Sequence, residues 1–262
     1  MDTIIASLAN PKIKWVKGLH KNSSRRKEGV FLVEGAKEIA SALSGGYIPR
    51  HVFVCPEIYA EELVLKGVAP RIHTVNREVF QKITYRGSSD GILAIFDATQ
   101  KTLDDLELGN TPSFIIVEGI EKPGNLGAII RSADGADIDA VIVCNSTCDI
   151  FNPNVIRASL GTVFTKQVVT ASNEQVSDFL AKHEITTYSA LLSERSSAYT
   201  AVDFTIPTAI VLGTEHDGLS EFWQQRSIPV VIPMRGSNDS LNVSNAAAIL
   251  AYEIVRQRDL LT

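Results

Sequence analysis

Three loops in the second half of the sequence carry residue types that suit a nucleotide-like ligand. The most unusual one runs from Met234 to Ser244 and is rich in Gly, Ser and Asn. Before it, Pro229–Pro233 is predicted to be a short buried strand, and after it the apolar spacing predicts a helix over Asn245–Arg258. A loop between a strand end and a helix start can bind such a ligand through backbone groups. The alternative is a plain helix entrance capped by Ser244, with Gly236 in a turn.

The other two loops also follow predicted strands. The first leads from Pro123 into a predicted helix that contains Arg131. The second, between Gly213 and Gly218, has two glycines that flank Glu215 and other polar residues. Glycines at a strand end let the backbone approach a ligand closely, while a carboxylate faces the pocket. Each of these loops, taken alone, is equally consistent with an ordinary turn and exposed charges.

The common alternatives for such a site are excluded at the level of motifs. The sequence has no phosphate-loop lysine and no G-x-G-x-x-G. Its five histidines are scattered, and its three cysteines do not form a C-x-x-C arrangement with a second pair. We therefore predict no metal site and three reduced thiols.

The strands that precede these loops are predicted to form a parallel sheet. Four nearly continuous apolar runs alternate with helical patterns, at 114–117, 140–143, 209–212 and 230–232. Such runs are typical of parallel strands covered by helices on both faces, with ligands bound beyond the carboxyl ends of the strands. The first part of the chain predicts a smaller α/β unit, with strands at 30–33, 51–54 and 92–96 and helices at 37–43, 59–65 and 78–83. A polar, turn-rich stretch predicts a linker, which gives an N-terminal domain at 1–98, a linker at 99–112 and a C-terminal domain at 113–262.

Composition and charge narrow the class of protein. The chain has 262 residues, of which 45% are hydrophobic, and no apolar stretch approaches the roughly 18 residues of a membrane span. We expect a cytoplasmic protein without a membrane partner. The net charge is −5, yet residues 11–37 contain eight Lys or Arg and only two Glu. This local excess favours phosphate binding, although a solvated helix face would look the same. The predicted RNA-binding residues are Lys12, Lys14, Lys17, Lys21, Arg25 and Arg26.

In order along the chain, the three loops resemble the three motifs of the SpoU (TrmH-type) RNA 2′-O-ribose methyltransferases of the SPOUT superfamily. The matching residues are Asn125-x-Gly127-x-x-x-Arg131-x-Ala133, Gly213-x-Glu215-x-x-Gly218 and Ile232-Pro233-Met234-x-Gly236-x-x-x-Ser240-Leu241-Asn242-Val243-Ser244. Arg157-Ala158-Ser159-Leu160-Gly161 resembles a further family segment. The resemblance extends over residues 113–258. Upstream, Phe31-Leu32-Val33-Glu34-Gly35 and the basic stretch resemble a substrate-binding domain related to kink-turn-binding ribosomal proteins.

This resemblance implies a trefoil-knotted parallel-sheet domain that binds S-adenosylmethionine, a homodimer, and RNA as substrate. General topology rules would instead favour an unknotted sheet. By their motif positions, the cofactor-binding residues are expected to be Leu212, Gly213, Ile232, Met234, Ser240 and Leu241. The catalytic residues are expected to be Asn125, Arg131, Glu215, Ser240 and Asn242.

Methyl transfer to a ribose hydroxyl requires alignment of the donor, the carbon and the nucleophile, and a group that takes the hydroxyl proton. Arginine stays protonated in proteins, so we expect Arg131 to hold the RNA phosphate and stabilise the developing negative charge. Asn125 and Glu215 would orient Arg131 and the ribose. A basic N-terminal module that recognises folded RNA favours ribosomal RNA over transfer RNA as the substrate. The alternatives are a non-catalytic RNA-binding factor with this fold and an enzyme that acts on a small nucleotide. Whether the methylation serves RNA maturation or antibiotic resistance stays open.

Overall fold

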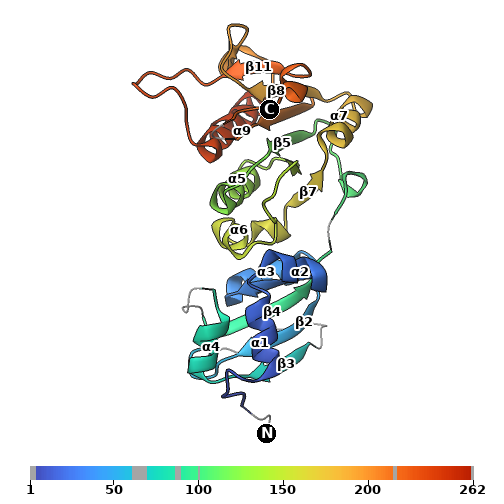
Figure 1. Cartoon of the computed structure of the whole chain (residues 1–262). Helices are drawn as coiled ribbons and strands as arrows, with labels where there is room; N and C mark the ends of the chain where they lie inside the picture. The colour runs from blue at the N-terminus through green and yellow to red at the C-terminus, as the bar shows by residue number, and fades with distance from the viewer. Residues whose placement is uncertain (1–3, 61–69, 86–89, 100, 215–216, 261–262) are drawn as a thin grey trace. The chain divides into compact units, whose positions relative to one another are not determined.

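The computed structural model describes residues 4–60, 70–85, 90–99, 101–214 and 217–260 (Figure 1). Its contacts divide the chain into two units. The first contains Met1–Thr99 and Phe151–Thr165, and the second contains Gln100–Ile150 and Lys166–Thr262. Each unit has its own sheet and its own hydrophobic core. The linker predicted at 99–112 stays a prediction.

The first unit contains a four-stranded mixed sheet in the order β1-β4-β2-β3. β4 (Ile92–Asp97) is antiparallel to both β1 (Val30–Glu34) and β2 (Pro49–Val54), whereas β3 (Arg71–Thr74) is parallel to β2. The strands predicted at 30–33, 51–54 and 92–96 are confirmed. β3 escaped prediction because this short edge strand consists mostly of polar residues.

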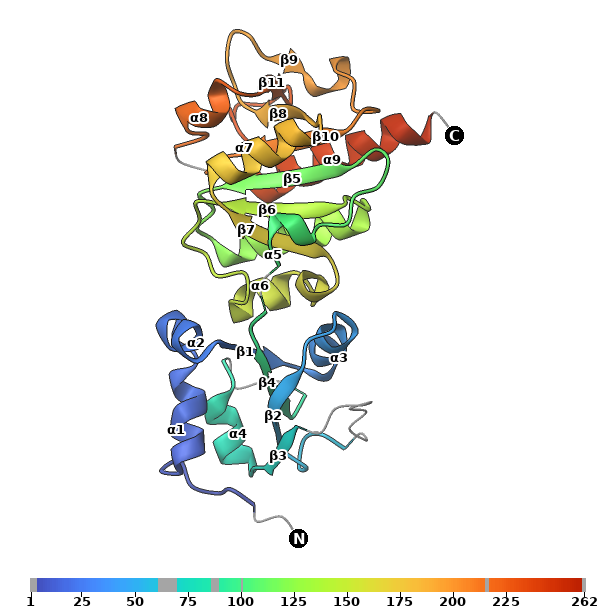
Figure 2. The same ribbon diagram turned by 90° about the vertical axis from the view of Figure 1, so that its right-hand side faces the viewer.

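Helices cover both faces of this sheet (Figure 2). α1 (Pro11–Gly18) and α4 (Arg77–Ile83) lie on one face, and α3 (Ala36–Ser44) lies on the other. α2 (Asn22–Glu28) leads into β1. The helices predicted at 37–43 and 78–83 are confirmed, whereas the helix predicted at 59–65 lies largely outside the described residues. The apolar sides of α1 and α4 pack on β2 and β4, through buried residues that include Ile13, Val16, Phe53, Phe80 and Leu93.

A segment from the middle of the sequence completes the first unit. It contains α6 (Pro153–Ala158) and the 3-10 turn η2 (Thr162–Phe164). The ring of Phe31 on β1 stacks on Phe151, with their centroids 4.4 Å apart. The Ser41 hydroxyl on α3 donates to the Gly161 carbonyl at 2.8 Å. No pattern along the chain indicated that this segment belongs to the first unit.

The second unit contains a parallel sheet in the order β7-β6-β5-β10-β8-β11-β9. The prediction of a parallel sheet is confirmed. Its strands are β5 (Ser113–Glu118), β6 (Ala140–Cys144), β7 (Gln167–Ala171), β8 (Thr186–Ala190), β9 (Ser197–Ala198), β10 (Thr208–Leu212) and β11 (Ile228–Val231). The strand predicted at 229–233 is therefore shifted, and it is only partly buried, since Ile228 is 48% exposed.

Helices cover both faces of this sheet as well (Figures 1 and 2). α7 (Asn173–Lys182) and α8 (Glu221–Gln224) pack on the face that carries Phe114 and Ile116. α5 (Pro123–Gly135) and α9 (Val243–Asp259) contact each other on the opposite face. Short 3-10 turns lie at Leu103–Asp105 (η1) and Tyr199–Ala201 (η3).

The strand order places a topological switch between β5 and β10. From β5 the chain passes outward to β6 and β7, and it later returns to the other side of β5, where β10 pairs with it. In open parallel sheets, ligands bind beyond the carboxyl ends of the strands at such a switch. The loops after β5 and β10 therefore lie where a ligand is expected.

Candidate active site

A cavity of about 430 Å³ lies at the carboxyl ends of β8, β10 and β11. Its volume is in the range of ligand pockets in proteins. All six residues predicted to bind the cofactor line it, namely Leu212, Gly213, Ile232, Met234, Ser240 and Leu241. Ala190, the last residue of β8, and the next two residues, Leu191 and Leu192, line it too. Sequence reasoning missed them because β8 contains polar residues and no continuous apolar run.

The loop after β10 folds back tightly along one wall of this cavity. The Thr214 amide donates to the Gly218 carbonyl at 3.0 Å, and Gly218 adopts a left-handed φ of 67°. At Gly213 a Cβ would lie 2.2 Å from the carbonyl carbon of Gly218, so no side chain fits there. Glycine is thus required at Gly213 by the lack of space and favoured at Gly218 by the backbone conformation. Glu215, which was predicted to be catalytic, lies outside the described residues.

Asn125 and Asn242, which are far apart in the sequence, meet beside this cavity. The Asn242 side-chain amide donates to the Asn125 side-chain oxygen at 3.3 Å. The Asn242 oxygen accepts from the Ser244 amide at 2.9 Å, so Asn242, and not Ser244, is the N-cap of α9. A second cavity of about 240 Å³ is lined by Asn125 and shares Gly213, Thr214 and Val243 with the first. The two cavities therefore lie side by side in one depression, with Asn242 on the wall of the first and Asn125 on the wall of the second.

Arg131 is not part of this depression within one chain. It lies on α5 six residues after Asn125, about 9 Å further along the helix axis. It is exposed, and it lines neither cavity. Ser240 does line the first cavity, where its hydroxyl donates to the Asp239 carboxylate at 3.2 Å. Of the five residues predicted to be catalytic, the described structure therefore brings together Asn125, Ser240 and Asn242.

A buried carboxylate holds the loop after β10 in place. Glu118, at the end of β5, is 7% exposed. It accepts hydrogen bonds from the Asn173 amide at 2.5 Å, the Ser220 hydroxyl at 2.7 Å and the Ser220 backbone amide at 2.9 Å. Asn173 in turn accepts from the Trp223 indole at 3.0 Å. Sequence reasoning missed this network, because the type of Glu118 gives no signal of its burial.

The residues predicted to bind RNA divide into five exposed residues and one buried residue. The exposed ones are Lys12, Lys14, Lys17, Lys21 and Arg26. Arg25 is 3% exposed, and its guanidinium donates to the carbonyls of Leu19 and His20 at 3.0 and 3.1 Å. Arg25 therefore holds the turn between α1 and α2 and is not available to phosphate, which corrects its prediction as an RNA contact.

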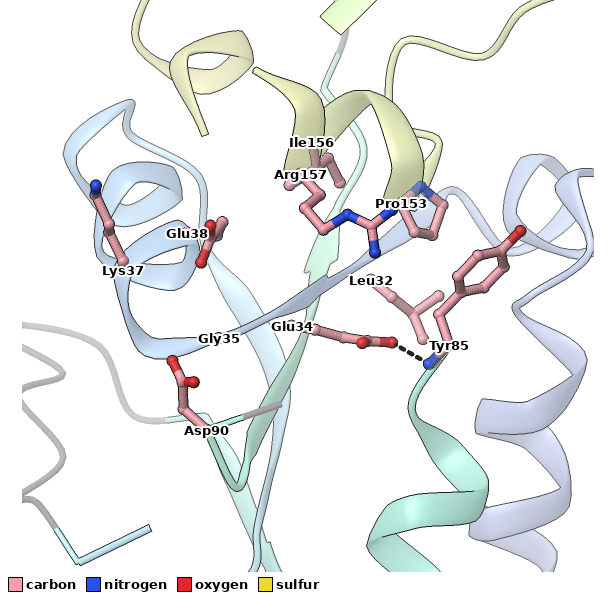
Figure 3. Close-up of a pocket in the computed structure, with 10 residues that line it drawn as sticks. All are labelled: Leu32, Glu34, Gly35, Lys37, Glu38, Tyr85, Asp90, Pro153, Ile156 and Arg157. Atoms are coloured by element: carbon pink, nitrogen blue, oxygen red, sulfur yellow. Dashed lines mark hydrogen bonds between the residues drawn. The ribbon is translucent and has the colours of Figure 1, made fainter. Parts of the chain in front are cut away.

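The first unit contains a further cavity of about 320 Å³, between the start of α3 and α6 (Figure 3). Glu34 lies at its base, where its carboxylate accepts from the Tyr85 amide at 2.5 Å. Burial raises the pKa of Glu34, while this hydrogen bond and the charge of Arg157 oppose the rise. The Arg157 guanidinium donates to the Asn154 side chain at 3.2 Å. Arg157, in the segment that resembles the family, thus lies in the first unit.

Three further properties of the described residues concern metal binding, membrane spans and reactive thiols. No three His, Cys, Asp or Glu side chains among them are grouped so as to hold a metal ion. Nor does any described helix combine the length and apolar character of a membrane span. Cys55, Cys144 and Cys148 are buried and unpaired, and burial raises the pKa of Cys144 to about 12. This thiol is therefore a poor nucleophile.

Comparison with known proteins agrees with this geometry. The model of the SpoU rRNA Methylase family matches residues 112–252, and that of the MRM3-like substrate binding domain matches residues 10–94. The chain is 27% identical to the 23S rRNA (guanosine(2553)-2′-O)-methyltransferase RlmP of Bacillus subtilis, over 95% of this chain and 98% of RlmP.

Solved structures are similar over almost the whole chain. A crystal structure of an RNA 2′-O ribose methyltransferase has a TM-score of 0.84 and 34% identity, and the match covers 98% of this chain and 99% of that one. The SpoU methyltransferase AviRb from Streptomyces viridochromogenes, in complex with the cofactor AdoMet, has a TM-score of 0.86 and 27% identity, over 95% and 98% of the two chains. The chain therefore belongs to the SpoU family of S-adenosylmethionine-dependent RNA 2′-O-ribose methyltransferases.

Proposed function

We propose that this protein transfers the methyl group of S-adenosylmethionine to a ribose 2′-hydroxyl of 23S ribosomal RNA. The observation that carries the proposal is the cavity at the sheet switch, since all six predicted cofactor residues line it and the asparagine pair lies beside it. RlmP and a second relative of nearly full length, the 23S rRNA (uridine(2479)-2′-O)-methyltransferase of Streptomyces viridochromogenes, are both named for 23S rRNA. They are named for different nucleotides, so the nucleotide methylated here is left open.

The walls of the cavity suit this cofactor. The loop after β10 offers backbone groups at Gly213 and Thr214, while Leu212, Ile232 and Leu241 offer apolar surface. A pocket of this kind holds an adenosine through main-chain hydrogen bonds and apolar contacts. The bound cofactor supplies an electrophilic methyl group. The protein has to hold the attacking 2′-oxygen in line with that group and keep competing water away.

The polar residues would act on the ribose and its phosphate. Asn242 is fixed by its cap interaction with Ser244 and by Asn125, so its side chain is already oriented before RNA binds. Arg131 would grip the phosphate with its planar guanidinium and stabilise the negative charge that develops on the 2′-oxygen. The proton would pass to a phosphate oxygen or to water, because a guanidinium that stays protonated cannot accept it. Glu215 would orient Arg131 or the ribose.

We further propose that two copies of the chain form the working enzyme, with a trefoil knot in the second unit of each. Arg131 is exposed and lines neither cavity of its own chain, so a second copy is the natural place for it to act. Exposed apolar surface on α9, where Tyr252 is 53% exposed, supports an interface there. The exposed lysines of α1 in the first unit would hold the RNA backbone.

The test uses the full-length protein, tritiated S-adenosylmethionine and ribosomal RNA from cells that lack this protein. Methylated RNA is digested with alkali, which cannot cleave beside a 2′-O-methyl group. A labelled, alkali-resistant dinucleotide from 23S rRNA is the expected product. Label only in mononucleotides would indicate base methylation, and a lack of label despite measurable cofactor binding would favour a non-catalytic RNA-binding factor. Label in transfer RNA alone would move the substrate to that class.

A further inference from the structure

Two histidines on neighbouring strands of the first unit share a hydrogen bond. His51 on β2 and His73 on β3 lie with Nδ1 of the former 2.9 Å from Nε2 of the latter. Their ring centroids are 5.2 Å apart and their planes are 22° apart, so the two rings meet edge to edge. One ring must donate to the other, so a single hydrogen lies between the two nitrogens. The pair can take up one proton and still keep this bond.

The pair is held rigidly at the edge of the core. The ring of Trp15 on α1 meets His51 edge-on, with centroids 5.2 Å apart, and Phe53 lies 4.8 Å from His73. Both histidines are partly buried, so they still reach the surface. β3 is an edge strand of its sheet. Aromatic packing thus fixes the two imidazoles beside an edge strand, whose end pairs with Ile5.

Among the residues that the structure describes, every charged group that shifts the pKa of this pair from outside it is positive. The cationic groups are Lys12 from α1, Arg50 from β2 and Arg71 from β3. Burial first, and then these charges, lower the pKa of His51 and bring the pKa of His73 to about 4. Arg50 has a partner in Asp97, whereas no ion pair is found for Lys12 or Arg71 with the described residues. Two cations without an ion pair to the described part of the chain thus lie near one site, in a protein whose net charge is −5.

An open depression lies against this cluster. It has a volume of about 660 Å³, and Asn10, Lys12, Ile72, His73 and Thr74 are among the residues that line it. Its apolar wall includes Ile72, which is 46% exposed. Cationic side chains beside apolar surface suit a nucleic-acid backbone, whose phosphates are charged and whose sugars are not.

We propose that Lys12, Arg71 and the His51–His73 pair form a phosphate-binding site for the RNA substrate, and that RNA binding at this site is coupled to the uptake of one proton by the pair. This inference rests on the proposed function for the identity of the polyanion. It adds β3 to the RNA-binding surface, which the basic stretch in the sequence did not include.

The sign of the coupling follows from the charges. In the free protein the pair is neutral near pH 7, because burial and the surrounding cations disfavour its protonation. A bound phosphate favours the protonated form and raises the pKa of the pair. RNA affinity therefore rises as the pH falls from the raised pKa of the complex towards the pKa of the free protein, by up to about tenfold per pH unit. Above this window the affinity does not change with protonation of the pair.

The experiment measures binding of full-length protein to an unmethylated 23S rRNA transcript between pH 5.5 and 8. Proton uptake comes from calorimetry in buffers of different ionisation enthalpy. Three variants are compared with the wild type, namely His73→Gln, the double variant Lys12→Gln/Arg71→Gln, and the control Lys82→Gln, which removes an exposed lysine on α4. Thermal unfolding checks that each variant is folded. Because Lys12 and Arg71 are exposed, the double variant remains informative if His73→Gln does not fold.

We expect the wild type and Lys82→Gln to take up about one proton on binding near pH 6, and His73→Gln to take up almost none while it binds as tightly as the wild type at pH 8. The double variant should lower the slope of log affinity against log salt by about 1–2. Equal salt slopes for the double variant and Lys82→Gln, or unchanged proton uptake in His73→Gln, would overturn the inference. Methylation of the same transcript is assayed separately, so failure of the proposed function is seen as loss of label with these binding differences intact.

Discussion

Substitution of Glu118 tests whether a buried carboxylate holds the loop after β10 in place. Glu118 receives three hydrogen bonds, two of them from Ser220 at the end of the loop that starts at Gly213. In Glu118→Gln, one carboxylate oxygen becomes an NH₂ group, and at least one of these donors then faces a donor. The cost of such a buried, unsatisfied group is about 1–3 kcal/mol. Glu118→Ala leaves all three donors without their acceptor, so it should cost more stability than Glu118→Gln.

The assay combines thermal unfolding with titration of S-adenosylmethionine. For a unit of this size, 1 kcal/mol corresponds to a change in Tm of about 2–4 °C. Glu118→Gln should therefore lower the Tm by several degrees, and it should weaken cofactor binding because Gly213 and Gly218 line the cavity. The matched control is Asp178→Asn, which removes an exposed carboxylate from α7 and should leave both quantities unchanged. If Glu118→Gln has the Tm and cofactor affinity of the wild type, the network does not position the loop.

Substitutions at three more positions test the proposed site. Arg131→Ala should lower turnover by about 10²–10³-fold, with little change in S-adenosylmethionine affinity. Arg131→Lys should restore little of this loss, because lysine lacks the planar fork of the guanidinium. Single-turnover methylation measures the rates of both variants, and near-normal turnover of the lysine variant would exclude phosphate clamping by Arg131. Asn242→Ala removes the cap of α9 and the contact with Asn125, so unfolding should show a loss of about 1 kcal/mol in stability, and turnover should fall as well. Gly213→Ala places a methyl group against the backbone of Gly218, with a strain of about 1–3 kcal/mol. Calorimetry should show this strain as weaker binding of S-adenosylmethionine. An unchanged Kd for S-adenosylmethionine would mean that the loop after β10 moves freely.

Much of the second unit could be predicted because its central strands are buried on both faces. β5, β6 and β10 are continuous apolar runs, and their burial is complete or nearly so. β7 and β8 escaped because they mix polar with apolar residues, and β7 is also an edge strand. The position of the cavity that we propose for the cofactor agrees with a general rule, since loops after parallel strands meet at one end of the sheet.

The contacts within the site could not be predicted in the same way. The bond between Asn125 and Asn242 joins residues 117 positions apart, and a pattern along the chain contains no information on such a distance. Residue type was also misleading at Arg25, because a guanidinium is usually exposed and this one satisfies two backbone carbonyls in the interior. Glu118 is the opposite case, in which a charged side chain in an apolar run is the residue that orders the neighbouring loop.

The segment Phe151–Thr165 shows why sequence order and structural unit differ in this protein. Phe151 and Phe164 stack on Phe31 from the first unit, with centroids 4.4 and 5.5 Å away, and a Cβ at Gly45 would lie 2.1 Å from the Phe164 carbonyl oxygen. All three phenylalanine rings are at least 96% buried. A fragment that ended at residue 98 would lose the rings that cover Phe31 and expose apolar surface. The RNA-binding properties of the first unit therefore have to be measured in the intact chain, because part of the core of this unit is encoded between the first and second motifs of the methyltransferase.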